Sequence, residues 1–201
     1  MRSLATILAA LLVSACASTP LVVDLPAYAY HASPETKLAR KAIANIDIRS
    51  TADDGNSVYG GLGADTSVQL KPAVPTKQTV ELDLRQFFAE VLSTDKASTR
   101  SITATIRRAE SYWIWSAAAK TPILGLAFAN ADTEFGMNVR VSIEVEEGGK
   151  VISSYLFDEK ITIQDKAATR EAIQASYKRL VAEYRKRLYA ELEVRFLQRY
   201  L

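Results

Sequence analysis

Apolar and polar residues alternate along four segments of the chain, which is the period expected of a strand with one buried face. The four segments are residues 42–49, 102–115, 139–145 and 151–163. Gly148 and Gly149 lie between the last two segments, and glycine tolerates the positive φ angles of tight turns. These two segments are therefore predicted to form a hairpin. The polar, glycine-containing loop at 50–71 either is partly mobile or holds a short strand near Ser67–Leu70.

Two other segments place apolar residues every three or four positions, as the buried stripe of a helix does. The first predicted helix covers about residues 84–92, with Asp83 and Gln86 as a capping box and Leu82 as a hydrophobic staple. The second covers residues 165–200 with Asp165 as its cap, and at roughly 50 Å it exceeds the diameter of a compact domain of this size. The element order predicts an α+β fold, an antiparallel sheet of about four strands with two helices on one face.

The first sixteen residues have the layout of a bacterial secretory signal. Arg2 precedes an apolar run at residues 4–13. This run is too short for a transmembrane helix, which needs about 20 apolar residues. Small residues follow and lead to Cys16, the only cysteine in the chain. The motif Val13-Ser14-Ala15-Cys16 resembles the lipobox of bacterial lipoproteins, whose cysteine is acylated and becomes the first residue of the mature protein.

This resemblance divides the chain into three parts. Residues 1–15 are predicted to be the lipoprotein signal peptide, residues 16–34 the acylated N-terminus with a flexible tether, and residues 35–201 a single periplasmic α+β domain. Two or three acyl chains on Cys16 would hold the protein on a membrane, since each buried methylene contributes about 0.8 kcal/mol. Ala17 follows the cysteine where inner-membrane lipoproteins usually carry aspartate, so the resemblance implies the periplasmic face of the outer membrane.

Charge and composition argue against several function classes. The chain has 25 basic and 23 acidic residues; loss of Arg2 with the signal leaves 24 against 23, a net charge of +1. A nucleic-acid-binding domain usually carries a basic excess, so no nucleic-acid partner is expected. The single histidine, His31, lies in the predicted tether, and no second cysteine is present to help hold a metal. We therefore expect no metal, no cofactor and no catalytic residues.

Two groups of residues remain as candidate surfaces. The first is aromatic and apolar, and it either packs under the long helix or forms an exposed surface for a membrane, a lipid or a partner protein. Its members are Tyr112, Trp113, Trp115, Leu124, Leu126 and Phe128. The second group is basic and is either a solvated helix face or a site for an anionic partner such as a lipid head group or peptidoglycan. Its members are Arg185, Lys186 and Arg187.

Taken together, these motifs make the chain similar to small bacterial outer-membrane lipoproteins of the YajG-like type and, more distantly, to the lipoprotein subunits that assist ABC-type lipid transporters. The shared features are the lipobox ending in Cys16, an early strand with Asp47-Ile48-Arg49, a glycine-containing loop, the helix predicted after Asp83, and a closing strand pair and helix. The resemblance implies a periplasm-facing α+β domain, and Cys16 is the one functional residue that it carries over.

Two functional hypotheses follow from these observations. The first is a lipid-anchored, non-enzymatic binding or assembly component with an envelope protein as its partner. The alternative is a lipid-binding auxiliary subunit of an envelope lipid transport system, in which the apolar segment after Tyr112 lines a groove between sheet and helix.

Overall fold

The computed structural model describes residues 22, 23, 25, 30–34, 36, 41–53, 66–115, 132–167 and 169–200. Cys16, Leu124, Leu126 and Phe128 lie outside the described residues, as does the predicted signal peptide.

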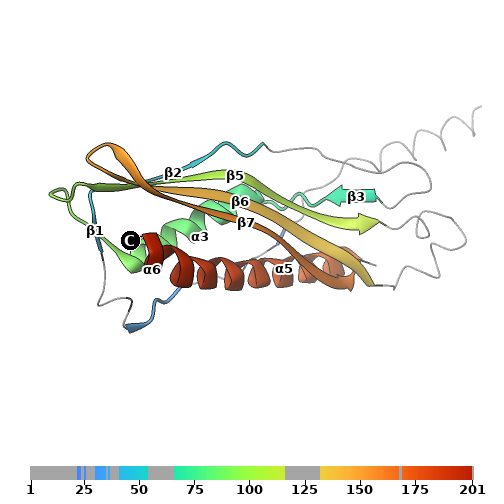
Figure 1. Ribbon diagram of the computed structural model, residues 1–201. Helices are drawn as coiled ribbons and strands as arrows, with labels where there is room; N and C mark the ends of the chain where they lie inside the picture. The colour runs from blue at the N-terminus through green and yellow to red at the C-terminus, as the bar shows by residue number, and fades with distance from the viewer. Residues whose placement is uncertain are drawn as a thin grey trace, which may run out of the picture.

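The described residues form a five-stranded sheet, a separate pair of short strands and two long helices (Figure 1). The sheet contains β2 (Asn45–Ser50), β3 (Thr66–Gln69), β5 (Arg100–Trp115), β6 (Asp132–Glu147) and β7 (Lys150–Lys166). The short pair consists of β1 (Lys41–Ile43) and β4 (Leu92–Thr94). The helices are α3 (Thr76–Val91) and α5 (Arg170–Glu191), and α5 continues into the π-helical segment η3 (Leu192–Leu197) and α6 (Gln198–Tyr200).

The sheet is mixed rather than purely antiparallel. Its strand order is β2-β5-β6-β7, with β3 also paired to β5. The pairs β5–β6, β6–β7 and β3–β5 are antiparallel, whereas β2 runs parallel to β5. A parallel pair needs a long crossover connection, and α3 lies in the chain between these two strands. The predicted α+β class is thus confirmed, but the predicted antiparallel sheet of four strands is wrong.

Several local predictions are confirmed with adjusted boundaries. The strand predicted at 42–49 is divided at Ala44 into β1 and β2, and the short strand near Ser67–Leu70 is present as β3. The predicted hairpin joins β6 to β7. Its turn places Gly148 at φ 58° and Gly149 at φ 79°, angles that side chains with a Cβ atom rarely adopt.

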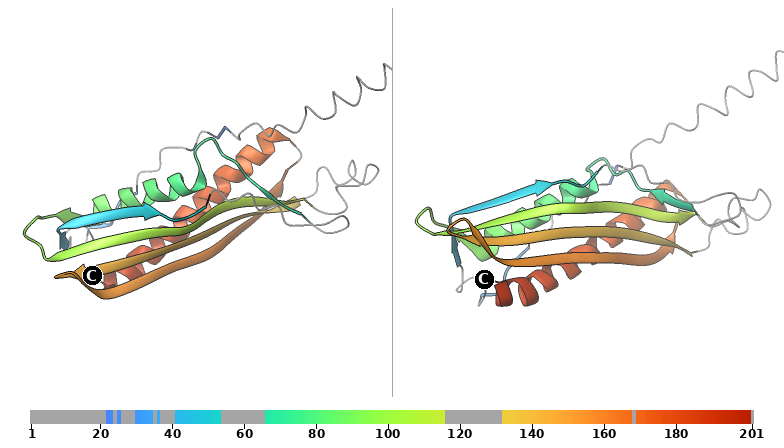
Figure 2. Two further views of the ribbon diagram at one scale, coloured as in Figure 1. Left: turned by 90° about the horizontal axis from the view of Figure 1, so that it is seen from above. Right: turned by 45° about the horizontal axis from the view of Figure 1, so that its top comes forward.

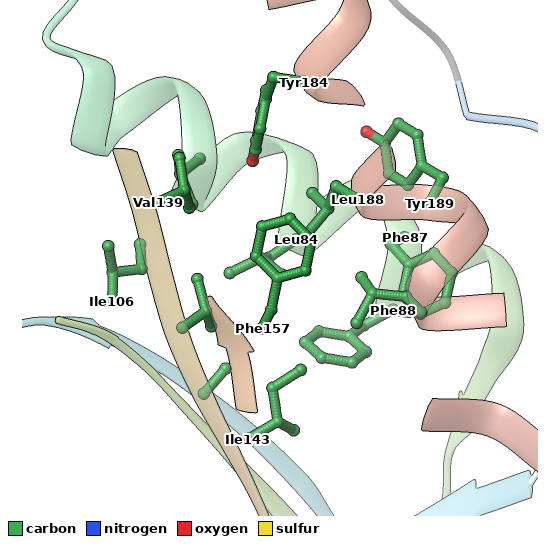
Figure 3. Packing of buried hydrophobic residues seen from close by; sticks show 14 of the residues in the cluster. Leu84, Phe87, Phe88, Ile106, Val139, Ile143, Phe157, Tyr184, Leu188 and Tyr189 are labelled. Atoms are coloured by element: carbon green, nitrogen blue, oxygen red, sulfur yellow. The ribbon is translucent and has the colours of Figure 1, made fainter. Parts of the chain in front are cut away.

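Both helices pack on the same face of the sheet (Figures 1 and 2). Alternate residues of β6 from Phe135 to Val145 point into this layer and are at most 1% exposed. Leu84 and Phe88 of α3 and Leu188 of α5 meet them from the helix side (Figure 3). Each fully buried apolar side chain of this size contributes about 1.5–3 kcal/mol relative to an exposed one. This interface is therefore the main source of the domain's stability.

The opposite face of the sheet carries polar side chains that pair across strands. Arg140 of β6 lies directly opposite Asp158 of β7, and its Nε donates to the carboxylate at 2.9 Å. This hydrogen bond and the charge of Arg140 hold the pKa of Asp158 below its usual range. Arg100 and Glu147 make a similar cross-strand pair at 3.1 Å.

The strand β5 contains a bulge that the alternation of the sequence did not predict. Its register against β6 shifts between Ile106 and Arg108. Arg107 is the extra residue, and its Nε donates to Ser142 Oγ at 3.0 Å on the outer face. Because a one-residue shift moves all later side chains to the other face, Trp113 points toward the helices and Tyr112 away from them, as their partners on β6 show.

The helix α3 starts at Thr76, earlier than predicted, and Pro75 occupies its N-cap position. Asp83, the predicted cap, is instead in the middle of the helix and 1% exposed. Arg185 Nε donates to its two carboxylate oxygens at 3.0 and 3.1 Å. Leu82, the predicted staple residue, is 48% exposed. The capping-box prediction is therefore wrong, because the carboxylate of Asp83 is stabilised by a cation from the other helix.

The helix α5 starts at Arg170, later than predicted. Thr169 caps it, and the Oγ1 atom accepts the Ala172 N–H at 3.1 Å. Asp165, the predicted cap, belongs to β7, where its carboxylate pairs with Arg179 at 2.6 Å. Through η3 and α6 the helical region reaches Tyr200, as predicted. Among the described residues, no helix is both long and apolar enough to cross a membrane.

A segment of the predicted tether packs against the helices. We call its described residues between Val22 and Ser33 the strap. The Val22 carbonyl accepts a hydrogen bond from Gln174 Nε2 at 2.7 Å. At the other end, Tyr30 is 6% exposed, and its ring lies 4.6 Å from that of Tyr189 and 5.1 Å from that of Phe87. Among the described strap residues, Tyr30 and Ala32 are buried and Val23 and Leu25 pack against the core, whereas Val22 is exposed.

Candidate functional site

Two strands share one edge of β5 and leave a gap between them. β2 pairs with β5 from Ser101 to Ile106, and β3 pairs with it from Tyr112 to Trp115. Because β2 is parallel and β3 antiparallel to β5, their carboxyl ends point toward each other. The Leu70 N–H still bonds to the Ser111 carbonyl at 2.8 Å, but neither strand pairs with residues 107–110.

A cavity of about 370 Å³ lies at this gap. It is bounded by the start of α3, the chain between β3 and α3, and the middle of β5. The lining consists of Asp53 and residues 69–72, 75–77 and 109–111. Four short segments, two of them separated only by residues 73 and 74, therefore build one site.

The cavity is lined by polar groups of both charge signs. Asp53 and Glu110 provide carboxylates, and Lys71 and Lys77 provide ammonium groups. The Oε1 atom of Gln69 is buried and has no hydrogen-bond partner among the described residues. An unsatisfied buried polar atom costs about 1–3 kcal/mol and is rare in folded proteins. The lining thus suits a small polar ligand or a polar side chain of a partner protein.

Contacts behind the cavity fix its shape. Thr76 Oγ1 and Ser111 Oγ, both buried, lie 2.9 Å apart and join the start of α3 to β5. The side chain of Tyr177 from α5 is fully buried next to them. Burial raises the pKa of Tyr177, and the hydroxyls of Thr76 and Thr79 offset part of this rise. The start of α3 and the strand β5 are therefore joined directly at the cavity, and α5 packs behind them.

Few features of the sequence pointed to this cavity. Pro72 and Pro75 mark the boundary between loop and helix, which is a signal for a turn before a helix start. No pattern in the sequence, however, predicts that Asp53 or Glu110 lines the same cavity as these prolines. The two proline positions are the one local feature that could have pointed to the site.

The predicted aromatic and apolar surface is not assembled as one patch in the described part of the chain. Trp113 is half-buried on the helix side, where its ring lies 6.5 Å from that of Phe135. Tyr112 lies on the outer face. For Trp115 the structure describes the backbone alone, and the other three residues of the group lie outside the described part. Of the two alternatives for this group, packing under the helix layer holds for Trp113.

Tyr112 forms a small polar cluster on the outer face. Its hydroxyl donates to Glu134 Oε1 at 3.2 Å, and Lys160 Nζ lies 3.3 Å from the same carboxylate. Burial raises the pKa of Tyr112. The ring lies over Gly136, the residue opposite it in the ladder, where a Cβ atom would collide with the ring. The glycine at this position thus leaves room for the tyrosine.

The three basic residues also divide among different environments. Arg185 is buried and bound to Asp83, so its assignment to a basic surface is wrong. Desolvation raises the pKa of Asp83, and Arg185 offsets part of that rise. Arg187 is partly exposed and lies 3.4 Å from Glu183 and 3.8 Å from Glu159. Lys186 is exposed. The ion pair with Asp83 explains why Arg185 is buried although the next residue, Lys186, is exposed.

Among the described residues, no group of three or more His, Cys, Asp or Glu side chains is arranged to hold a metal ion.

The sequence matches no protein-family model, and no curated protein is significantly similar to it. The solved structure of protein XCC0632 from Xanthomonas campestris, described as family DUF330, is similar to this chain with a TM-score of 0.42 and 13% sequence identity. The match covers 85% of this chain and 90% of that protein. At these values the similarity supports no conclusion about function.

Proposed function

We propose that this chain is a non-enzymatic binding or assembly component of the bacterial cell envelope. In this proposal, acyl chains on Cys16 anchor it to the periplasmic face of the outer membrane. The observation that carries the proposal is the lipobox-like motif that ends at the only cysteine. A protein held in this way at a membrane by its first mature residue keeps its folded domain outside the bilayer, where a partner can reach it.

The partner in this proposal is another envelope protein, and the cavity at the sheet gap is its binding site. Two observations support this choice: the lining carries both charge signs, and a hydrogen bond between Thr76 and Ser111 joins the helix and the strand that line the cavity. A polar side chain of a partner that entered the cavity would pair with one of its charged groups. Such a contact gives specificity because leaving it unmade costs about 1–3 kcal/mol.

The anchoring part is tested by Cys16→Ser. Serine cannot form the thioether to the lipid, so the variant is expected to incorporate no labelled palmitate and to lose nearly all membrane attachment. The measurement is palmitate labelling together with fractionation of cells into soluble and membrane proteins. Ser18→Ala, two residues further on, is the matched control and should behave as the wild type. A Cys16→Ser protein that stays in the membrane fraction would contradict the anchor.

The binding part is tested by reversing a charge at the cavity. Lys71→Glu places a third carboxylate next to Asp53 and Glu110 and should reduce the yield of cross-linked envelope partner about tenfold, the equivalent of 1.4 kcal/mol. The measurement is chemical cross-linking in intact cells followed by quantitative mass spectrometry. Lys150→Glu makes the same charge change on the exposed end of β7 and serves as the control. Equal cross-linking in both variants would refute the cavity as the site.

The alternative, a lipid-binding auxiliary subunit, receives less support from the geometry. It was expected to place acyl chains in a groove between sheet and helices. In the described residues that interface is filled by side chains such as Phe157, Tyr177 and Tyr184, which are at most 2% exposed. The cavity lies at the sheet edge instead, and its charged lining does not favour an acyl chain.

A further inference from the structure

The N-terminal strap contacts the domain at one identifiable end. β5 ends at Trp115, β6 begins at Asp132, β7 ends at Lys166 and α5 begins at Arg170, and we call this the Trp115 end of the domain. Asp132 and Lys166 are paired in the ladder, and only a short connection links Lys166 to α5, so these element ends lie together (Figure 1). The turn between β6 and β7 marks the opposite end, which we call the hairpin end.

Val22, the first described residue of the strap, is bound near the Trp115 end. Its carbonyl accepts the hydrogen bond from Gln174, which lies about one turn into α5. Tyr30, by contrast, is held by Tyr189 and Glu193, much nearer the hairpin end. The two described contacts of the strap therefore lie at different positions along the helical region, that of Val22 near the Trp115 end and that of Tyr30 nearer the hairpin end.

The lengths of chain and helix agree with this path. The 19 helical residues from Gln174 to Glu193 rise about 28 Å. The eight residues from Val22 to Tyr30 can reach at most about 29 Å. The chain between the two contacts is therefore just long enough to join them.

The remaining chain up to the proposed anchor is short compared with the domain. Six residues separate Cys16 from Val22, and they span at most about 22 Å. The 16-residue strand β6 is roughly 50 Å long. An acylated Cys16 lies at the membrane surface, so the contact between Val22 and Gln174 cannot be farther from that surface than this short span.

We infer that the Trp115 end of the domain faces the lipid bilayer and that the hairpin end points away from it. This inference rests on the proposed acylation of Cys16 and names the surface that the bilayer contacts. The gap cavity then lies along the side of the domain, because it is lined by the middle of β5 rather than by either end. A partner in the envelope would therefore reach it from the side, parallel to the membrane.

The tryptophans of the chain provide a direct test. Trp113 and Trp115 are its only tryptophans, and both lie at the Trp115 end. The mature chain starting at Cys16 is coupled through that thiol to maleimide lipids in vesicles that also contain dansyl head groups. Energy transfer from tryptophan to dansyl is then measured. A comparison variant moves the reporter to the hairpin end by combining Trp113→Phe and Trp115→Phe with Val151→Trp.

Transfer should be at least about fivefold stronger for the native tryptophans than for the moved one, since Trp113 and position 151 lie roughly 40 Å apart along the sheet. Equal transfer, or stronger transfer from position 151, would overturn the inference. A second variant adds Val151→Trp and keeps both native tryptophans, so its result does not depend on the Phe substitutions. The third tryptophan should increase the tryptophan fluorescence without increasing energy transfer to dansyl. Chemical coupling makes this result independent of natural acylation, which the Cys16→Ser experiment tests separately.

Discussion

Replacing Asp83 with leucine is expected to lower the free energy of unfolding by about 3–5 kcal/mol. The substitution removes the carboxylate to which the buried Arg185 donates, and removing one partner of a buried ion pair is strongly destabilising. The loss should appear in urea denaturation as a lower midpoint with an unchanged slope. Glu81→Leu on the exposed face of the same helix is the control, because its ion pair with Arg85 is solvent-accessible and should contribute at most about 1 kcal/mol.

The paired variant Asp83→Leu with Arg185→Met distinguishes the ion pair from simple packing. Removing both members of the ion pair leaves neither charge to be buried, so most of the lost stability should return. A double variant as unstable as the single one would mean that the two residues act through side-chain shape rather than charge. A loss below 1 kcal/mol in the single variant would mean that water reaches Arg185.

Replacing Tyr30 with alanine is the second large effect, with an expected loss of about 3 kcal/mol. The ring is 6% exposed and packed on Phe87 and Tyr189, so its removal leaves a cavity between strap and helices. Tyr30→Phe keeps the ring and removes only the hydroxyl that donates to Glu193, and it should lose about 0.5–1.5 kcal/mol. Denaturant unfolding measures both, and limited proteolysis within the strap should accelerate only in the alanine variant.

The same tyrosine gives a pH dependence with a defined sign. Burial and the nearby Glu193 raise the pKa of Tyr30 well above its ordinary value. Its stabilising contribution is therefore complete below the pKa of an unfolded tyrosine, about 10, and is lost as the pH rises toward the folded value. An alanine variant that matches the wild type at neutral pH would show that the strap contributes nothing to stability.

Sequence patterns predicted the elements better than their ends. The alternation found the long strands and the β6–β7 hairpin, because strand periodicity reports which face is buried at each position. The capping pattern at Asp83 led to a wrong prediction of the helix start. The residue that binds the Asp83 carboxylate is Arg185, which is 102 residues away, and local capping rules do not consider such distant residues. The bulge at Arg107 inverted the faces of Tyr112 and Trp113 for a similar reason: the extra residue is visible only against the register of β6.

The candidate site was less predictable than the fold. Its lining comes from four segments, and the gap exists because β2 and β3 approach β5 from opposite directions. The parallel direction of β2 relative to β5 depends on the crossover connection that contains α3. Composition and periodicity do not specify this connection. The anchoring hypothesis differs from the candidate site, because it depends entirely on the consecutive residues that end at Cys16. Such a motif can be found from the sequence without knowledge of the fold.

The turn at Gly148 and Gly149 has a consequence for the order in which the chain folds. It joins two of the longest strands with almost no loop, and α5 follows β7 within a few residues. Closing such short loops costs little entropy, whereas pairing Asn45 with Ser101 must close a loop of 56 residues. The C-terminal half is thus the natural nucleus. During synthesis or export the N-terminal half emerges first, yet β2 must wait for a partner that arrives later.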